Sequence, residues 1–263
     1  MMAATDKLLV TLGDGIKRIT INRPERRNSV DIETIELLHE EIQRSAKDDS
    51  RVIILTGAGD SFCAGADLQA SSERDIRDVD VTASLREHTN PTILAMRELA
   101  KPIIARVHGH AVGVGCNYAL ACDILIASEQ AKFGQVFVKI GLMPDGGSTY
   151  FLPRIVGYAR AFELMATGDI IGARDALALG MVNHVVPVEG LDDAVNKMAA
   201  RLAAAPAIAV GRIKAGLNHG EKSDLAGALE FEAVNQGACF HSEDFLEGVN
   251  AFREKRMPNF KGK

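Results

Sequence analysis

A single carboxylate in GLMPDGGSTYFLPR, residues 141–154, stands where it can do chemistry. Asp145 follows a proline and precedes a glycine pair, and the residues from Ser148 onward have a helical pattern. The aspartate can cap that helix, because Asp side chains accept hydrogen bonds from the free N–H groups of a first helical turn. It can instead carry a proton in general acid and base catalysis. Taken alone, this stretch leaves both interpretations open.

Two turns rich in small residues can supply hydrogen-bond donors to a reacting oxygen. The first, DSFCAGADL (residues 60–68), follows an apolar strand pattern, and its small side chains let a ligand approach the backbone. The second, Gly113-Val114-Gly115, stands where a helix should begin, so its N–H groups point outward. Such N–H groups are typical of an anion or oxyanion site. The first turn is equally compatible with an ordinary strand-to-helix connection capped by Asp67.

Other catalytic and binding motifs are missing from the sequence. The third glycine of a dinucleotide-binding motif is replaced by Tyr118, and neither a GK[ST] phosphate loop nor a G-x-S-x-G motif occurs. His108 and His110 have no nearby third ligand, so we predict no metal site. The basic C-terminal run FREKRMPNFKGK is either a solvated helix end or a source of cations for a phosphorylated ligand.

The composition fits a soluble globular chain of 263 residues with one large or two unequal domains. A formal net charge of −5 without a sustained basic run argues against nucleic acid or an anionic membrane surface as the partner. No segment is apolar over about 18 residues and no secretion signal is visible, so we expect a cytoplasmic protein. Without a CxxC pair, the cysteines are expected to be buried reduced thiols: Cys63, Cys116, Cys122 and Cys239.

Strand and helix patterns alternate across the first 190 residues and predict an α/β domain with mainly parallel pairing. LLVTLGDGIKRITINRP predicts a β-hairpin, and Asp31 is expected to cap a helix with Ile35, Leu38 and Ile42 as its apolar stripe. RVIILTG, PIIARVHG and ILIAS are typical of strands buried on both faces. We expect the site at the carboxyl ends of these strands.

Two further segments differ from this pattern. Residues 70–90 are dominated by charges and keep no clear period, so we expect a mobile loop over the site. Residues 191–263 contain helical patterns almost exclusively and are expected to form a C-terminal helical layer, packed on the core or on a neighbouring subunit. The predicted division is therefore 1–190 and 191–263.

Four stretches in this order resemble the successive motifs of the crotonase, or enoyl-CoA hydratase/isomerase, superfamily: NRPERRNSV, SFCAGADL, GHAVGVGCNYALACDI and FGQVFVKIGLMPDGGSTYFLPRIVG. The resemblance extends from about Lys7 to the C-terminus. It implies a core of repeated ββα units, a C-terminal helical region (191–263) that forms trimers, which often pair into hexamers, and acyl-CoA thioesters as substrates. Coenzyme A then enters as part of the substrate, and no further cofactor is implied.

The resemblance also implies roles for individual residues. The N–H groups of Ala66 and Val114 match the donors to the thioester oxygen; the family often has glycine in place of Val114, but only the N–H is needed. Phe252 and Lys255 match positions that reach the CoA phosphates, often across a subunit boundary. The residues implied for the remainder of CoA are Arg27, Ser29, Ala64, Gly65, Ala66, Asp67, Leu68 and Gly113.

The likeness to hydratases fails at their two glutamates, which are matched here by Asn117 and Phe137. Neither residue can exchange a proton at neutral pH. Asp145 instead resembles the aspartate of 1,2-epoxyphenylacetyl-CoA isomerases, dienoyl-CoA isomerases and 4-chlorobenzoyl-CoA dehalogenases. The second group keeps a glutamate at the Phe137 position. The third has a tryptophan there and a histidine near Leu94, so the first group fits best.

The sequence therefore predicts an acyl-CoA isomerase in which Asp145 takes a proton from one atom of the acyl group and returns it to another. Apolar neighbours, namely Phe137, Leu142 and Met143, are expected to favour a raised pKa at Asp145. Two alternatives remain. One is an enoyl-CoA hydratase that uses Asp145 alone, and the other is a member that binds acyl-CoA without turnover.

Overall fold

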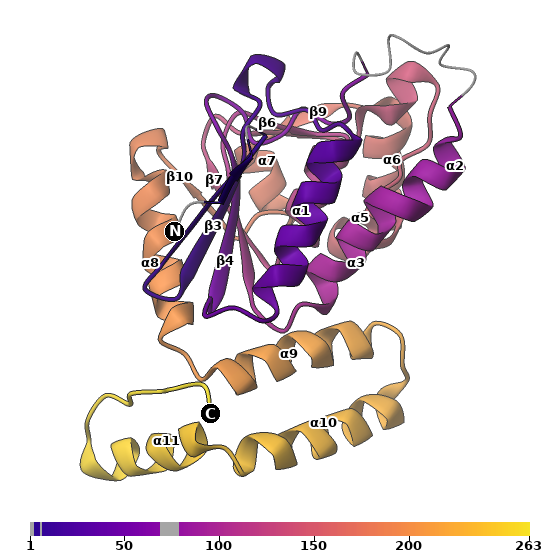
Figure 1. Cartoon of the computed structure of the whole chain (residues 1–263). Helices are drawn as coiled ribbons and strands as arrows, with labels where there is room; N and C mark the ends of the chain where they lie inside the picture. Colours follow the sequence, from indigo (N-terminus) through magenta and orange to yellow (C-terminus); the bar gives the residue numbers. More distant parts are fainter. Residues whose placement is uncertain (1–2, 6, 69–78) are drawn as a thin grey trace.

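The computed structural model describes residues 3–5, 7–68 and 79–263, and a seven-stranded sheet lies at its centre (Figure 1). From one edge to the other the order is β1-β2-β3-β4-β5-β7-β10, and the smaller sheet has the order β6-β8-β9. The bounds are β1 (Ala3–Thr5), β2 (Leu8–Gly13), β3 (Ile16–Ile21), β4 (Val52–Gly57), β5 (Ile103–Val107), β6 (His110–Val112), β7 (Ile124–Ser128), β8 (Lys132–Gly134), β9 (Ile170–Gly172) and β10 (His184–Val186).

The larger sheet confirms the predicted α/β class. Strands β3, β4, β5, β7 and β10 pair in parallel, whereas β1, β2 and β3 pair antiparallel. The predicted hairpin is β2 and β3, whose two-residue turn holds Asp14 at φ 52° and Gly15 at φ 73°. Two positive φ values are typical of the tight turns that match the twist of a hairpin.

Helices cover both faces of the larger sheet. Helix α8 packs on one face, and α1, α3 and α4 contribute to the core on the other. The helical elements are η1 (Pro24–Arg26), α1 (Ile32–Ser45), α2 (Val81–Ser84), η3 (Leu85–Thr89), α3 (Asn90–Glu98), α4 (Val114–Ala121), η4 (Val136–Ile140), α5 (Ser148–Val156), α6 (Tyr158–Thr167), α7 (Ala173–Ala178), η5 (Val188–Gly190), α8 (Leu191–Ala203), α9 (Ala207–Gly220), α10 (Leu225–Phe240) and α11 (Glu243–Glu254).

Strand β4 illustrates how the sequence builds these layers. All six of its residues are buried; Val52 and Ile54 pack with α8, while Ile53 and Leu55 belong to the core on the other face. Successive side chains of a strand point to opposite faces, so a strand covered on both sides must be apolar throughout. Asp31 caps α1 as predicted, because its side chain accepts a 2.9 Å hydrogen bond from the N–H of Thr34.

The expectation of a loop over residues 70–90 is wrong for its second half. Residues 81–89 form α2 and the π-helical η3, and Asp80 caps this segment by accepting a hydrogen bond from the N–H of Ala83. Contacts of η3 with α1 and α3 hold this segment in place, although its sequence lacks a periodic apolar stripe. Residues 69–78 lie outside the described part of the chain. No helix among the described residues is long and apolar enough to cross a membrane.

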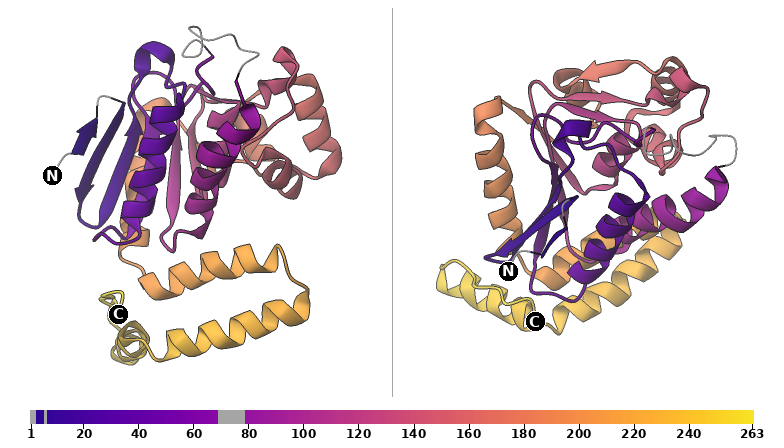
Figure 2. Two further views of the ribbon diagram at one scale, coloured as in Figure 1. Left: turned by 45° about the vertical axis from the view of Figure 1, so that its right-hand side comes forward. Right: turned by 45° about the horizontal axis from the view of Figure 1, so that its top comes forward.

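The C-terminal helices divide into two groups. Helix α8 is part of the core, since Leu191, Val195 and Ala199 pack against the sheet. Helices α9, α10 and α11 form an arm that extends away from the sheet (Figures 1 and 2). The helices predicted from residue 191 are thus present, but separation from the sheet begins at Ala207. A role of this region in trimerisation stays a prediction.

The arm is fastened to the amino-terminal edge of the parallel strands. Arg51, just before β4, donates hydrogen bonds to the carbonyl of Ala205 at 2.7 Å and to that of Phe260 at 3.1 Å. Lys214 of α9 is buried, with its ammonium 2.8 Å from the Asp123 carboxylate and 2.8 Å from the carbonyl of Met96. These contacts fix where the arm leaves the core.

Replacing Lys214 by Met is expected to lower the free energy of unfolding by about 2 kcal/mol, because Asp123 loses its nearest cation and keeps only Arg97 at 3.8 Å and the N–H of Ile103 at 2.7 Å. Urea unfolding measures the change. Lys197→Met, on the exposed side of α8, is the matched control and should lie within about 0.5 kcal/mol of the wild type. Equal unfolding midpoints for the two variants would contradict the role of Lys214 in anchoring α9.

Candidate active site

The candidate site lies at the carboxyl edge of the parallel strands, where the loops after β3, β4 and β6 meet. After β4 the chain pairs in parallel with β6, with Cys63 opposite Ala111, and then with the loop after β3, with Ala66 opposite Val30. These pairings confirm that the carboxyl ends of neighbouring strands bring the first two motifs together.

The Ala66 turn leaves one N–H group without an acceptor among the described residues. The carbonyl of Gly65 accepts from Val30, and the N–H of Asp67 donates to Val30, both at 2.9 Å. In a parallel bridge of this kind, Ala66, which lies between Gly65 and Asp67, directs its own N–H away from Val30. No described residue accepts a hydrogen bond from the N–H of Ala66.

The Val114 turn lies directly beside the Ala66 turn. A Cβ added to Gly113 would lie 3.6 Å from the Cα of Gly65, and one added to Gly65 would lie 3.2 Å from the carbonyl oxygen of Val112. Val114 begins helix α4, where an N–H has no acceptor within the helix. The donors of Ala66 and Val114 therefore follow two glycines that pack on each other, each with positive φ.

Asp145 lies next to this pair of turns. Gly146 packs against α4: a Cβ at Gly146 would lie 3.5 Å from Val114 and 3.2 Å from the side-chain nitrogen of Asn117. The carboxylate has no hydrogen bond or ion pair with a described residue. Burial raises the pKa of Asp145 from its usual 3.8 to about 6. The raised pKa arises from desolvation alone and suits a group that takes up and releases a proton near neutral pH.

The alternative that Asp145 caps helix α5 is wrong. Helix α5 begins at Ser148 without a side-chain cap, and the N–H and hydroxyl of Ser148 donate to the backbone carbonyl of Asp145 at 3.0 and 2.9 Å. The carboxylate is left for other contacts. Of the neighbours expected to desolvate it, Phe137 is buried, whereas Leu142 and Met143 are exposed in the single chain.

Asn117 and Phe137 lie near Asp145, and neither has a side chain that can act as an acid. Asn117 is 0% exposed, and its amide nitrogen donates a 2.8 Å hydrogen bond to the backbone carbonyl of Asp145. Its amide oxygen accepts from Gln135 at 2.8 Å. The ring of Phe137 lies 3.9 Å from the Cβ position of Gly113 and forms an apolar wall beside the turns. The amide of Asn117 is therefore hydrogen-bonded at both its nitrogen and its oxygen inside the protein.

The residues expected to hold CoA gather around the Ala66 turn. The N–H of Ala64 donates to the carbonyl of Arg27 at 3.0 Å, while Ser29 precedes the bridge of Val30 with Ala66. The carboxylate of Asp67 is bound by the Arg23 guanidinium at 2.7 Å, which fixes the turn; the helix that Asp67 was expected to cap would begin outside the described residues. Of the expected set, Arg27, Ala66 and Leu68 are exposed, Gly113 lies in the adjacent turn, and the others are buried or half-buried.

Sequence reasoning missed two residues that support this arrangement. Asn28, 0% exposed and at φ 58°, donates to the carbonyls of Ala58 and Ser61 at 2.7 and 2.6 Å. A left-handed φ is common for asparagine, and the NS pair in NRPERRNSV was the available signal. Gln135 had no such signal, because its partner lies eighteen residues away in the sequence.

Phe252 and Lys255 lie at the other end of the molecule. Both belong to the end of α11, on the arm at the amino-terminal edge of the strands, and both are exposed. One chain therefore does not bring them to the Ala66 and Val114 turns. A contact with CoA requires a neighbouring subunit, as the prediction allowed.

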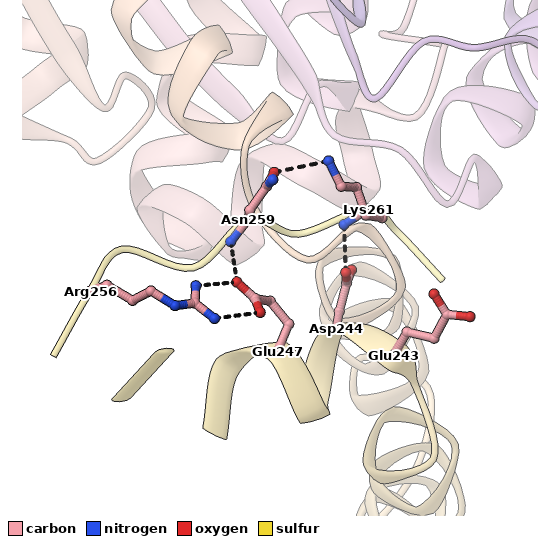
Figure 3. Close-up of a pocket in the computed structure, with 6 residues that line it drawn as sticks. All are labelled: Glu243, Asp244, Glu247, Arg256, Asn259 and Lys261. Carbon is pink, nitrogen blue, oxygen red and sulfur yellow. Dashed lines mark hydrogen bonds and ion pairs between the residues drawn. The ribbon is translucent and has the colours of Figure 1, made fainter. Parts of the chain in front are cut away.

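In the hollow beside α11, the charged residues of the lining bind one another (Figure 3). The Arg256 guanidinium binds Glu247 at 2.6 and 2.9 Å, and the N–H of Lys261 donates to Asp244 at 2.6 Å. The acidic lining and these pairings disfavour a phosphate there. The residues that line the hollow are Glu243, Asp244, Glu247, Arg256, Asn259 and Lys261.

The histidines and cysteines that the sequence singled out can also be placed. The described residues contain no cluster of three potential metal ligands. His108 and His110 do not continue one strand, because Gly109 at φ 54° separates β5 from β6. Three cysteines are buried free thiols, as expected, but Cys239 is only half-buried.

Two backbone donors beside one desolvated carboxylate, at the loop edge of an α/β core, define a class of enzymes that polarise a carbonyl next to a proton carrier. The chain belongs to the enoyl-CoA hydratase/isomerase family, whose sequence model matches residues 11–263. This membership confirms the crotonase-type fold and, at the level of the family, action on acyl-CoA thioesters.

Individual relatives carry mixed names. The chain is 40% identical to the 1,2-epoxyphenylacetyl-CoA isomerase of Escherichia coli (strain K12) over 254 residues, which cover 95% of this chain and 96% of that protein. It is 37% identical to the crotonyl-CoA hydratase of Syntrophomonas wolfei, with 98% of each covered. The crystal structure of an enoyl-CoA hydratase from Bacillus anthracis superimposes with a TM-score of 0.93 at 34% identity, covering 98% of this chain and 100% of that one.

The raised pKa of Asp145 predicts an unusual dependence of stability on pH. The folded protein binds this proton more tightly than the unfolded chain, so ionised Asp145 opposes folding, and the penalty disappears as the pH falls from about 6 through 3.8. Asp145→Asn is therefore expected to melt at a higher temperature than the wild type at about pH 8, with the difference vanishing toward about pH 4.

Asp31→Asn is the control with the opposite sign. Burial alone would raise the pKa of Asp31, but hydrogen bonds from Lys7 and Thr34 lower it to about 2. Its stabilising contribution is present above 3.8 and lost only as the pH falls through about 2, so this variant should melt lower at both pH values. Scanning calorimetry measures both. A lower melting temperature of Asp145→Asn at about pH 8 would contradict the desolvation of Asp145.

Proposed function

We propose that this protein is an acyl-CoA isomerase that moves a proton, and with it a double bond, or opens an epoxide, through a thioester enolate. One observation supports the choice of isomerase: next to the paired turns, the described residues offer the desolvated Asp145 as proton carrier, whereas the Asn117 amide is hydrogen-bonded at both its nitrogen and its oxygen and Phe137 is apolar. A reaction that needs one carboxylate fits this set better than one that needs two.

The proposed chemistry starts with Asp145 removing a proton from a carbon of the acyl group. The electrons move onto the thioester oxygen, which accepts hydrogen bonds from the N–H groups of Ala66 and Val114, each worth roughly 3 kcal/mol in the transition state. Asp145 then returns the same proton to another carbon or to the opening epoxide oxygen. Because its pKa is about 6, both the base and the acid form are accessible near neutral pH.

The CoA portion is proposed to lie along the Ala66 turn and the loop after β3. Arg27 is exposed there, and its carbonyl is bound to Ala64. Because Gly65 and Gly113 have no side chains, the narrow pantetheine arm can approach the backbone closely at these residues. The reaction as proposed balances without any further cofactor, since the proton that Asp145 removes is the one it returns.

Hydration is the second candidate, because several relatives, including the crotonyl-CoA hydratase of Syntrophomonas wolfei, are named as hydratases. In that case Asp145 alone would have to activate water and protonate the substrate carbon. The engaged amide of Asn117 argues against help from the position that carries a glutamate in hydratases. A 3-hydroxyacyl product from crotonyl-CoA would favour hydration over isomerisation.

Asp145→Asn is expected to reduce kcat by about 10²–10⁴-fold on enoyl- and phenylacetyl-derived CoA thioesters, because the variant cannot carry the proton. Chromatography of products from a thioester panel measures this and separates isomers from 3-hydroxyacyl products. Asp193→Asn, on the exposed side of α8, is the matched control and should retain wild-type rates. Full turnover by Asp145→Asn would refute the proposed role, and tight binding of every thioester without turnover by the wild type would indicate a binding protein.

We also propose that the arm mediates assembly into trimers or hexamers. None of the 16 residues of α10 is buried in the single chain. The arm lies far from the candidate site of its own chain. Large apolar side chains are exposed along α9, α10 and α11, namely Ile213, Leu217, Leu225, Leu229, Val234, Phe240 and Leu246. Such a surface needs cover, and a second copy of the chain also offers a route for Phe252 and Lys255 to reach a site.

Light scattering after size exclusion is expected to give three or six times the 28.2 kDa mass of one chain. Leu229→Asp should reduce this mass, because it places a charge in the apolar surface of α10, whereas Glu230→Gln on the same helix should not. A wild-type mass of one chain would contradict the assembly.

A further inference from the structure

We propose that Gln135 is a positioning residue of the active site, acting through Asn117 on the backbone of Asp145. The proposal rests on the proposed function of Asp145. It starts from the line of hydrogen bonds that joins the amide of Gln135 to the amide of Asn117, and this amide to the carbonyl of Asp145, each 2.8 Å long.

Burial of the Gln135 amide at this place in the fold is unfavourable in free energy. It lies between β8 and η4 and is 2% exposed, and its amide oxygen has no hydrogen-bond partner among the described residues. A buried acceptor without a partner costs free energy that an apolar side chain would avoid. Its amide nitrogen, by contrast, donates to Asn117. Gln135 also lies beside the weakly polar Cys116 thiol, so the bond to Asn117 is the strong hydrogen bond among the described contacts of its side chain.

The hydrogen bond from Gln135 determines which way the Asn117 amide faces. An amide has a donor end and an acceptor end, so when Gln135 binds the oxygen, the nitrogen must face Asp145. Without Gln135 the amide is free to turn, and its oxygen would then oppose the carbonyl oxygen of Asp145. Because Asn117 is 0% exposed, bulk solvent does not reach the amide to relieve the mismatch.

The position of the Asp145 carboxylate depends on this backbone contact. The side chain has no hydrogen bond or ion pair with a described residue, and the two following residues, Gly146 and Gly147, have φ of 52° and 83°. A loop built on two left-handed glycines is held from the α4 side by Asn117, whose side-chain nitrogen lies 3.2 Å from the Cβ position of Gly146. A shift of the loop would move the carboxylate relative to the donors of Ala66 and Val114.

Gln135→Met tests the proposal, because methionine keeps the length of the side chain and removes the amide. We expect kcat to fall about tenfold with KM changed less than about twofold, since a small displacement of a catalytic group affects the reacting geometry more than binding. We also expect the low-pH limb of kcat/KM to move below that of the wild type, because a displaced Asp145 is less desolvated.

Ser45→Ala is the matched control for loss of a buried hydrogen bond away from the site. Ser45 is 0% exposed and donates to the carbonyl of Glu41 within α1. It should lose stability without changing kcat or the pH profile. The double variant Gln135→Met/Asn117→Ala should be no slower than Asn117→Ala alone, because both residues act through one line of hydrogen bonds.

The inference is overturned if Gln135→Met keeps the wild-type kcat and pH profile, or if the double variant multiplies the two single effects. If Gln135→Met does not fold, Gln135→Glu takes its place: its carboxylate cannot donate, so its kcat relative to wild type should rise as the pH is lowered, and a constant ratio refutes the proposal. Full activity of Asp145→Asn would instead remove the proposed function. Loss of activity in Asp145→Asn with normal behaviour of Gln135→Met removes this inference alone.

Discussion

The close approach of Gly65 to Gly113 is the constraint on which the site depends. Two turns from different strands can offer neighbouring N–H groups only when their backbones nearly touch. A side chain at either glycine would have to adopt a left-handed φ, and at Gly65 it would also crowd the carbonyl oxygen of Val112 at 3.2 Å. The parallel pairing of Cys63 with Ala111 sets the register, and Ala66 and Val114 each lie three residues after their member of this pair.

Around this backbone contact, charged and polar side chains fix the loops and leave the reactive group free. Arg23 holds Asp67, Asn28 holds the chain at Ala58 and Ser61, and Asn117 holds the carbonyl of Asp145. The Asp145 carboxylate has no such partner among the described residues, and burial without a partner raises its pKa. The asparagine at a position where hydratases carry a glutamate thus serves the loop, which is consistent with the proposed one-carboxylate chemistry.

The two edges of the sheet have separate roles. The carboxyl edge carries the paired turns and Asp145, while the amino edge holds the arm through Arg51 and Lys214. A single chain therefore keeps its C-terminal basic and aromatic residues away from its own site. Under the proposed assembly, the same separation makes the arm of one chain available to another.

Periodicity and local chemistry in the sequence determined the hairpin, the buried strands, the cap at Asp31 and the helices after residue 191, because these features depend on neighbours within a few residues. The ordered motifs likewise determined the family and pointed to Ala66, Val114 and Asp145. Only the tertiary structure decided that Asp145 is no cap, that α8 belongs to the core, and that residues 81–89 are helical. It also revealed Gln135, since a hydrogen bond between residues eighteen apart leaves no local pattern. The physical reason is the same in each case: burial and long-range pairing depend on how distant segments meet.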